Sequence, residues 1–213
     1  MTTVAADGRP GEPSEHLPAD RIRLAVIIGS TREGRFGPTV ARWFAGRAGR
    51  HDDIDLDVID LGEAWLPDVL SVDGHEPDGH RPQPVRSLAR WLSAADAFVI
   101  VTPEYNHSFP GSLKTAIDWF RAEWQAKPVG FVSYGGLAGG LRAVEQLRLV
   151  FAELDAVTIR ETVSFHNHTE RFGEDGRPRD SAAEDKAADV LLARLGWWAR
   201  ALRAHRSRHP YGR

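Results

Sequence analysis

The stretch from residue 97 to residue 119, AFVIVTPEYNHSFPGSLKTAIDW, decides the fold of this chain. Its first five residues are all apolar and include three β-branched side chains, which is typical of a strand buried on both faces. A polar and aromatic loop follows over 102–111, and helical spacing of the apolar residues begins at Gly111 and runs to about 123. The stretch therefore predicts a strand, a rigid loop and a helix in direct succession.

The same succession recurs on both sides of this stretch. The apolar patterns predict strands at 22–28, 54–60, 97–101, 129–133 and 156–163, and helices at 38–49, 85–94, 111–123, 139–154 and 182–204. Segments 62–84 and 165–180 are rich in polar residues, and we expect them to be loops. Five strand–helix units in sequence predict an α/β fold with a parallel sheet.

Length and composition exclude several classes of protein. The 213 residues fit one domain, expected over 21–204, with a disordered leader at 1–20 and a basic tail at 205–213. The net charge of −3 argues against a nucleic-acid binder. The chain has no cysteine, which excludes disulfides, thiolate nucleophiles and iron–sulfur clusters and fits a cytoplasmic location. It has no apolar run of about 18 residues and no apolar segment near its beginning, so neither a membrane span nor a secretory signal is expected.

The loop after the first strand, GSTREGRFGPT at 29–39, is suited to a phosphate monoester. It combines hydroxyls and arginines with the N-terminus of a helix, although an ordinary glycine-rich turn is an alternative interpretation. A Walker A motif is not present, because Arg35 and Phe36 stand where Lys and Ser/Thr should be. Thr31 also breaks the dinucleotide fingerprint, and we therefore interpret Asp60 as a strand-end acid rather than a ribose ligand.

Two more strands end in unusual loops. TPEYNHSFPG, at 102–111, is stiffened by two prolines and can hold a planar heterocycle by main-chain N–H groups and stacking. SYGGLAGG, at 133–140, allows close approach of the backbone to a ligand, although it is also a plausible flexible turn. Because ligands of open parallel sheets bind beyond the carboxyl ends of the strands, we expect the three loops to meet at one edge.

Together these loops resemble the NADPH-dependent FMN reductase family, which includes quinone, chromate and azo reductases. The resemblance rests on Gly29-Ser30-x-Arg32, on the run from Pro103 to Trp119, and on the glycine loop, and it covers about residues 22–164. It implies a flavodoxin-like three-layer sandwich, with a five-stranded parallel sheet of order 2-1-3-4-5 and bound FMN. NADPH or NADH would be the electron donor.

The resemblance also implies a set of cofactor-binding residues. Ser30 and Arg32 would hold the FMN phosphate. Relatives often have Ser and Asn where this chain has Arg35, Phe36 and Gly37; Arg35 would supply charge in place of a hydroxyl, and Thr39 would supply a hydroxyl from the first turn of the helix. The residues expected along the flavin ring are Pro103, Glu104, Tyr105, Asn106, Ser108, Ser133, Tyr134, Gly135 and Gly136. We expect neither a protein nucleophile nor a metal ion, because the flavin would carry the chemistry.

The expected activity is hydride transfer from the nicotinamide to FMN, followed by reduction of a quinone, azo dye, free flavin or metal oxyanion. A negative charge on Glu104 would lower the flavin's reduction potential. The alternative is a non-enzymatic flavodoxin-like electron carrier or regulatory flavin-binding module. A nucleotide-phosphate hydrolase is disfavoured by the defective Walker pattern.

Several other residues admit more than one interpretation. His166 and His168 flank Asn167, and a solvated loop is favoured over a metal site because a third ligand is not evident nearby. Trp197 and Trp198 cannot share one helical face, so one is expected in the core and the other at a subunit contact. Trp119, Phe120 and Trp124 raise the same possibility of a contact. Family resemblance implies a homodimer or homotetramer.

Overall fold

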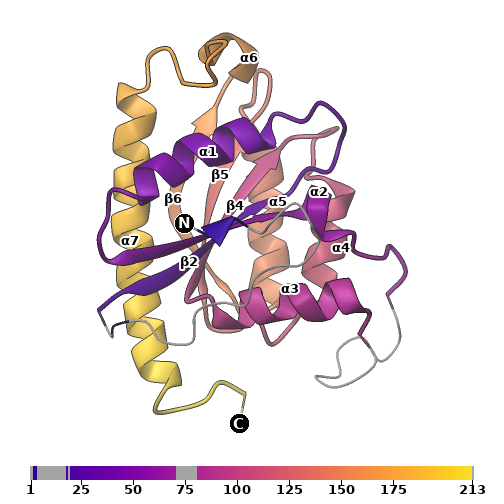
Figure 1. The fold of residues 1–213 in the computed structure, drawn as a ribbon, viewed down its shortest axis with the longest axis vertical. Coiled ribbons are helices and arrows are strands. Elements are labelled where there is room, and N and C mark those ends of the chain that lie inside the picture. Colours follow the sequence, from indigo (N-terminus) through magenta and orange to yellow (C-terminus); the bar gives the residue numbers. More distant parts are fainter. Residues whose placement is uncertain (1, 4–17, 19, 71–80, 213) are drawn as a thin grey trace.

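A computed structural model describes residues 2–3, 18, 20–70 and 81–212 of the chain. Six parallel strands form one sheet in the order β1-β3-β2-β4-β5-β6 (Figure 1). The strands are β1 (Thr2–Thr3), β2 (Ile22–Ile28), β3 (Ile54–Asp60), β4 (Ala97–Pro103), β5 (Pro128–Tyr134) and β6 (Val157–Phe165). Without the two-residue β1, which pairs with β3 at one edge, the order is the predicted 2-1-3-4-5.

Helices cover both faces of the sheet (Figure 1). The long helices are α1 (Gly37–Ala48), α3 (Gln83–Ala94), α4 (Gly111–Asp118), α5 (Leu141–Glu153) and α7 (Ala182–Arg206), and the single-turn helices are α2 (Leu61–Ala64) and α6 (His168–Arg171). Residues of α1 and α7 pack in one core cluster, and residues of α3, α4 and α5 pack in another. The central strands β2, β4 and β5 are buried along their whole length, as expected for strands between two helical layers.

The structure corrects three element predictions. Helix α4 ends at Asp118 instead of 123, because Trp119, Phe120 and Trp124 turn inward and are almost fully buried. These three aromatics belong to the core and are not available for a subunit contact. The predicted loop 62–84 overlaps the single-turn α2 at its beginning and the first two residues of α3 at its end. Segment 165–180 contains α6 and a bridge between Phe172 and Pro178, with Phe172 buried.

The outer parts of the chain also differ from the prediction. Thr2 and Thr3 belong to the sheet, whereas most of the predicted leader and residues 71–80 of the predicted loop lie outside the described residues. Neither Trp197 nor Trp198 is buried, because α7 turns Leu191, Leu195 and Ala199 to the sheet and leaves both indoles beside that face. Within the described ranges, helices that combine the length and apolar character of a membrane span do not occur.

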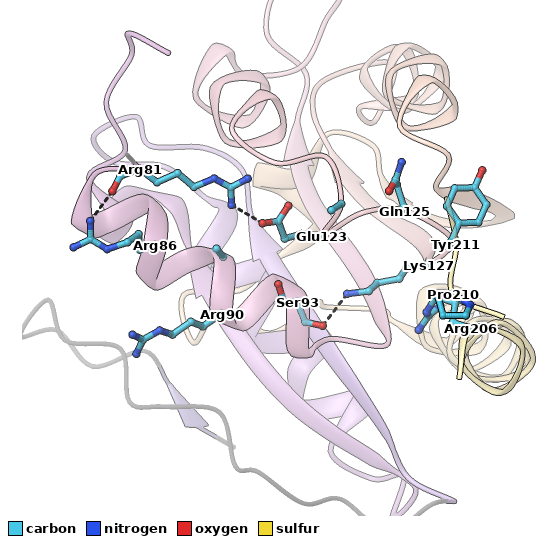
Figure 2. A pocket seen from close by; sticks show the side chains of 12 residues that line it. Arg81, Arg86, Arg90, Ser93, Glu123, Gln125, Lys127, Arg206, Pro210 and Tyr211 are labelled. Carbon is cyan, nitrogen blue, oxygen red and sulfur yellow. Dashed lines mark hydrogen bonds and ion pairs between the residues drawn. The ribbon is translucent and has the colours of Figure 1, made fainter. Parts of the chain in front are cut away.

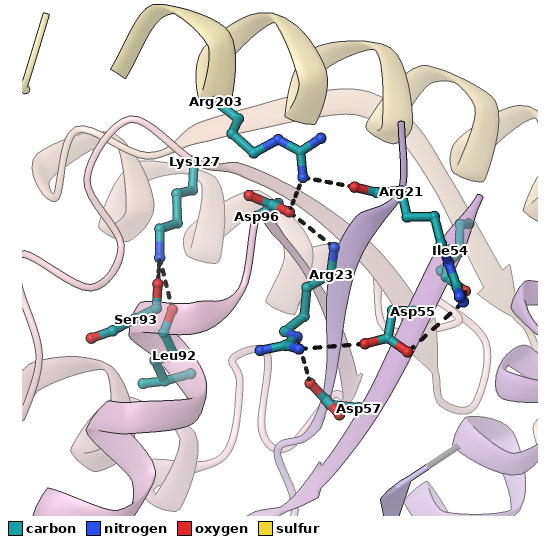
Figure 3. A network of polar contacts seen from close by, with 10 residues as sticks. All are labelled: Arg21, Arg23, Ile54, Asp55, Asp57, Leu92, Ser93, Asp96, Lys127 and Arg203. Atoms are coloured by element: carbon teal, nitrogen blue, oxygen red, sulfur yellow. Dashed lines mark hydrogen bonds and ion pairs between the residues drawn. The ribbon is translucent and has the colours of Figure 1, made fainter. Parts of the chain in front are cut away.

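Polar contacts fasten α7 to the amino ends of the strands (Figure 3). The buried carboxylate of Asp96, just before β4, accepts a 3.0 Å hydrogen bond from the backbone N–H of Arg23 and a 2.8 Å bond from Arg203. Arg23 reaches Asp55 and Asp57 on β3, at 3.5 and 3.7 Å. This network closes the end of the sheet opposite to the three loops.

Candidate functional site

The three predicted loops follow β2, β4 and β5, which are adjacent in the sheet, so all three leave from one edge. The first and second loops touch through hydroxyls, since Ser30 Oγ lies 2.7 Å from the phenol oxygen of Tyr105. The second and third loops touch through the backbone, where the N–H of Glu104 donates to the carbonyl oxygen of Tyr134 at 3.3 Å. The expected convergence is therefore present.

The part of the candidate site that is expected to bind a phosphate group consists of Ser30, Arg32 and the beginning of α1. Helix α1 carries a proline in its first turn and has no side-chain cap at its N-terminus. The N–H groups of Thr39 and Val40 donate to the carbonyl oxygen of Phe36, at 3.0 and 3.3 Å, so what this helix end offers an anion is mainly the positive end of its dipole. The exposed Arg32 has its guanidinium carbon 5.6 Å from the centre of the Tyr105 ring, so a positive charge lies beside the contact between the first two loops.

The first loop contains three more of the expected cofactor-binding residues, and these contact partners other than Ser30 and Arg32: they are Arg35, Phe36 and Thr39. Arg35 Nη2 donates to Asp60 Oδ2 at 2.6 Å, and the same carboxylate accepts the N–H of Gly62 through its other oxygen. Phe36 packs between Tyr134, His168 and Phe172, with ring centres 4.8–6.1 Å apart. The methyl group of Thr39 faces Gly176 across the outer side of α1. Phe36 thus lies beside Tyr134 of the third loop, Thr39 contacts Gly176, and the charge of Arg35 is partly neutralised by Asp60.

The second loop is a tight turn on which side chains are presented at fixed positions. The backbones of Tyr105 and Ser108 exchange hydrogen bonds of 2.8 and 3.0 Å, and Asn106 and His107 between them have φ of 50° and 69°. Positive φ at both central residues is the pattern of a type I′ turn, which asparagine tolerates well. Asn106 and His107 are exposed at its tip, while Ser108 Oγ donates to Gln146 on α5 at 2.6 Å. Pro103 is buried at the end of β4.

The charge of Glu104 is balanced within the site. Its Oε1 accepts a 2.8 Å bond from Arg142 Nη1, and its Oε2 lies 3.3 Å from the backbone N of Arg142 at the beginning of α5. Sequence reasoning predicted a bare negative charge here and missed Arg142. Its position just after the glycine loop, in the first turn of a helix, was the signal that pointed to it.

The third loop is held mainly by its own residues. Ser133 is fully buried and donates to the carbonyl oxygen of Gly139 at 2.8 Å, and Tyr134 is also buried. The hydroxyl of Tyr134 faces Gly37 and has no hydrogen-bond partner of normal geometry among the described residues, and burial raises the pKa of this phenol above its usual value. Ser133 and Tyr134 thus shape the loop, whereas Gly136 is exposed.

Residues 166–168 support the glycine loop, which the sequence did not indicate. The backbone N–H groups of Asn167 and His168 donate to the carbonyl oxygens of Gly136 and Gly135, at 2.9 and 3.1 Å. Nδ1 of His166 lies 2.8 Å from the carbonyl oxygen of Leu137, and Nδ1 of His168 lies 3.0 Å from that of Gly135. Both histidines are therefore engaged with the loop. Within the ranges described, groups of three or more metal-ligand side chains are not found.

Comparisons with known proteins identify relatives of this chain. A model of the family described as NADPH-dependent FMN reductase matches residues 22–170. The chain is 36% identical over 122 residues to an NAD(P)H-dependent FMN reductase of Schizosaccharomyces pombe, a match that covers 55% of this chain and 60% of that protein. It is 32% identical over 155 residues to the 2-hydroxy-1,4-benzoquinone reductase of a Burkholderia species, which covers 70% of this chain and 80% of that protein.

A solved structure shares the fold. The flavoenzyme NAD(P)H:(acceptor) oxidoreductase FerB of Paracoccus denitrificans superposes with a TM-score of 0.64 at 23% identity, covering 86% of this chain and 98% of that chain.

Proposed function

The chain belongs to the NADPH-dependent FMN reductase family, and we propose that it oxidises NADPH or NADH and reduces small acceptors such as quinones through FMN held by the three loops. The observation that carries this proposal is the contact of the three loops at one sheet edge, through Ser30 with Tyr105 and through Glu104 with Tyr134. The flavin, when bound, supplies hydride and electron transfer between donor and acceptor.

The residues present fit such a cofactor. An uncapped helix N-terminus, the hydroxyl of Ser30 and the guanidinium of Arg32 suit a phosphate monoester. When the Tyr105 hydroxyl is the donor in its bond to Ser30 Oγ, the serine O–H remains available to donate to a phosphate oxygen. The remaining expected contacts, from Pro103 to Ser108 and from Ser133 to Gly136, border the place proposed for the ring.

The protein's own part in the reaction is positioning and electrostatics. The type I′ turn holds Asn106 at a fixed place, and Glu104 and Arg142 together bring a neutral ion pair to the junction of the second and third loops. A proposed ring in this place would lie against main-chain N–H groups rather than against a side-chain acid or nucleophile. Electron acceptors would then be selected mainly by whether they can reach the flavin ring. This would allow several classes of small oxidant, including quinones, azo compounds, free flavin and metal oxyanions.

The proposed assembly is a homodimer or a homotetramer. Trp197 is 61% exposed, and its ring stands at 89° to that of Trp198, with the centres 5.2 Å apart. Two indoles next to each other on the outer side of α7 form an apolar surface that a second subunit would cover.

Steady-state assays of FMN-loaded protein test the proposed activity. We expect benzoquinone-dependent oxidation of NADPH or NADH, with one quinone reduced per nicotinamide oxidised. Protein that binds FMN but does not oxidise either nicotinamide in the presence of quinone would support the electron-carrier or binding-module alternative instead.

A further inference from the structure

Trp65 is a bulky residue in a backbone conformation that favours glycine. It ends the single-turn α2 with φ of 49° and ψ of 44°, in the left-handed region, where a Cβ is disfavoured. Its side chain is 81% exposed, so burial of the indole offsets little of this strain. Because strained residues cluster at binding and catalytic sites, Trp65 is a candidate for function rather than for stability.

The outward position of Trp65 is set by its neighbours in the chain. Leu61, at the beginning of α2, is buried in the core, and Leu66 packs against the same core cluster. The carbonyl oxygen of Pro67 accepts a 2.9 Å hydrogen bond from Nε1 of the buried Trp119. The backbone is therefore anchored on both sides of Trp65, and the indole is presented from a fixed point.

A pocket of about 300 Å³ lies beside this indole. Its lining comes from α2 and the residues that follow it, from Thr31 of the first loop, and from Ser112 and Thr115 of α4. Helices α2 and α4 are in contact, and both follow strands of the sheet at the carboxyl-end edge (Figure 1). The volume is at the small end of the range for ligand pockets, which suits one ring system with its sugar rather than a whole dinucleotide.

The pocket adjoins the place proposed for the flavin. Ser112 Oγ donates to the carbonyl oxygen of Gly29 at 2.9 Å, which joins the beginning of α4 to the first loop. Thr31 lines the pocket, whereas Ser30, one residue earlier, makes the contact between the first and second loops. A ligand that extends from the flavin ring past the first loop would therefore reach the pocket.

The lining combines an aromatic face with polar side chains. The carboxylate of Asp68 suits the hydroxyl donors of a ribose, and the hydroxyls of Thr31 and Thr115 can donate or accept. An exposed indole face can stack on a nucleobase, since every base has a π-face. A purine nucleoside carries both the planar ring and the sugar hydroxyls that such a lining fits.

We propose that this pocket binds the adenosine part of the nicotinamide nucleotide that donates electrons, with the adenine ring stacked on Trp65. The inference rests on the proposed function, since NADPH and NADH both carry adenosine joined through a pyrophosphate to the reacting nicotinamide. The nicotinamide has to reach the flavin ring, so the adenosine lies at a distance from it. A quinone acceptor has one ring system, which must itself reach the flavin, and it is therefore not the occupant of this pocket.

Calorimetry on FMN-saturated protein tests the pocket without turnover. The probe is ADP-ribose, which contains adenosine and pyrophosphate but no nicotinamide. We expect one ADP-ribose to bind per chain, with no release of FMN in parallel flavin fluorescence. Trp65→Ala should weaken this binding at least about fivefold, the lower end of the effect of losing one base–aromatic stack, and Trp65→Phe should bind more tightly than Trp65→Ala.

Tyr211→Ala is the matched control, because it also removes an exposed aromatic side chain. Tyr211 lines a different cavity together with Ser93 and Lys127, which come shortly before β4 and β5, so it lies at the opposite edge of the sheet (Figure 2). The control should bind ADP-ribose as the wild type does.

Trp65→Gly separates a binding role from a structural one. Glycine adopts a positive φ without strain, and little buried area is lost with the exposed indole. The variant should therefore unfold at a urea concentration equal to or above that of the wild type, although it binds ADP-ribose at least about fivefold more weakly. A clear fall in the urea midpoint would show that the indole stabilises the fold and would contradict the proposal.

Steady-state kinetics distinguish the two ends of the donor, with benzoquinone as acceptor. Trp65→Ala should raise the KM for NADH and NADPH at least about fivefold, with kcat retained. The KM for reduced nicotinamide mononucleotide, which has no adenosine, should be unchanged. Equal rises for NADH and for the mononucleotide would overturn the assignment to adenosine.

The proposal is wrong if ADP-ribose does not bind, if it releases FMN, or if Trp65→Ala and the control bind it equally. Binding of ADP-ribose that depends on Trp65, in a protein that oxidises neither NADPH nor NADH, would support the pocket and refute the proposed function.

Discussion

The carboxylate of Glu104 and the guanidinium of Arg142, 38 residues apart in sequence, form a 2.8 Å ion pair that joins the second loop of the candidate site to the beginning of α5. The carboxylate is mostly shielded from solvent, with 11% of its side chain exposed, whereas Arg142 is 42% exposed. The site thus receives a neutral pair where the sequence alone indicated one negative charge.

This pair predicts opposite effects of two substitutions on the flavin. Glu104→Gln leaves the charge of Arg142 unbalanced and should raise the midpoint potential, because a positive charge stabilises the more negative reduced flavin. Arg142→Gln should lower it, each by roughly a few tens of millivolts, given that 30 mV corresponds to about 1.4 kcal/mol for two electrons. Spectroelectrochemistry measures both, and the double variant should lie near the wild-type value. An unchanged potential in both single variants would exclude an electrostatic role.

The arginines of the first loop differ in their predicted effects on FMN affinity. Arg32→Ala should weaken FMN binding by about 1.5–3 kcal/mol, the value of a charge-assisted phosphate contact. Arg35→Ala should have a smaller effect, because Asp60 already holds that guanidinium. Fluorescence titration of apoprotein with FMN measures both constants. A larger loss in Arg35→Ala than in Arg32→Ala would reverse the phosphate assignment.

Two glycines of the third loop, Gly140 and Gly136, provide a matched test of the loop's backbone conformation. Gly140 has φ of 85°, and a Cβ there would lie 2.7 Å from Cβ of Ser133. Gly140→Ala should therefore destabilise the fold by about 2 kcal/mol or more. Gly136 has open space around it, so Gly136→Ala should leave the unfolding free energy within about 0.5 kcal/mol. Urea denaturation distinguishes them, and equal destabilisation would contradict the loop geometry.

The buried carboxyl group of Asp57 should make the free energy of unfolding depend on pH (Figure 3). Desolvation raises its pKa to about 6, despite the attraction of Arg23. The folded state then binds more protons than the unfolded state between about pH 4 and pH 6, so this residue's contribution to stability falls as pH rises through that window. Above about pH 6, the ionised carboxylate of Asp57 lowers the free energy of unfolding by a few kcal/mol, since a shift of one pKa unit corresponds to about 1.4 kcal/mol.

Asp57→Asn removes this term and leaves Asp55 to pair with Arg23. The variant should gain stability relative to the wild type as pH rises from 4 to 7, which urea denaturation at each pH would show. Asp175→Asn, on an exposed loop, is the control. A difference that stays constant with pH would argue against a raised pKa at Asp57.

The strands and the parallel sheet were predictable because they depend on local apolar runs, whereas the strand order came from the family resemblance. The burial of β4 follows from residues 97–101 alone, and adjacency of parallel strands brings their loops together. The inward turn of Trp119 and Trp124 was not predictable, since their spacing also fits a longer helix. It is set by tertiary bonds from the indole N–H groups to the carbonyls of Pro67 and Ile117.

Individual side chains in the site were less predictable than its location. Phe36 and Tyr134 both lie in segments that carry the family pattern, yet Phe36 packs against His168 from a segment that read as a polar loop. The partners of Arg35 and Glu104 are 25 and 38 residues away along the chain. Such long-range pairs depend on the assembled fold, so the position of Arg142 after the glycine loop marked a candidate residue but did not indicate its partner.

Anaerobic addition of NADPH to FMN-loaded protein tests the central claim most directly. The account predicts that the flavin absorbance near 450 nm bleaches on mixing and that subsequent addition of benzoquinone restores it. A flavin spectrum that persists with excess NADPH and with excess NADH would contradict the reductase assignment. Failure of the protein to bind FMN at all would contradict the three-loop site itself.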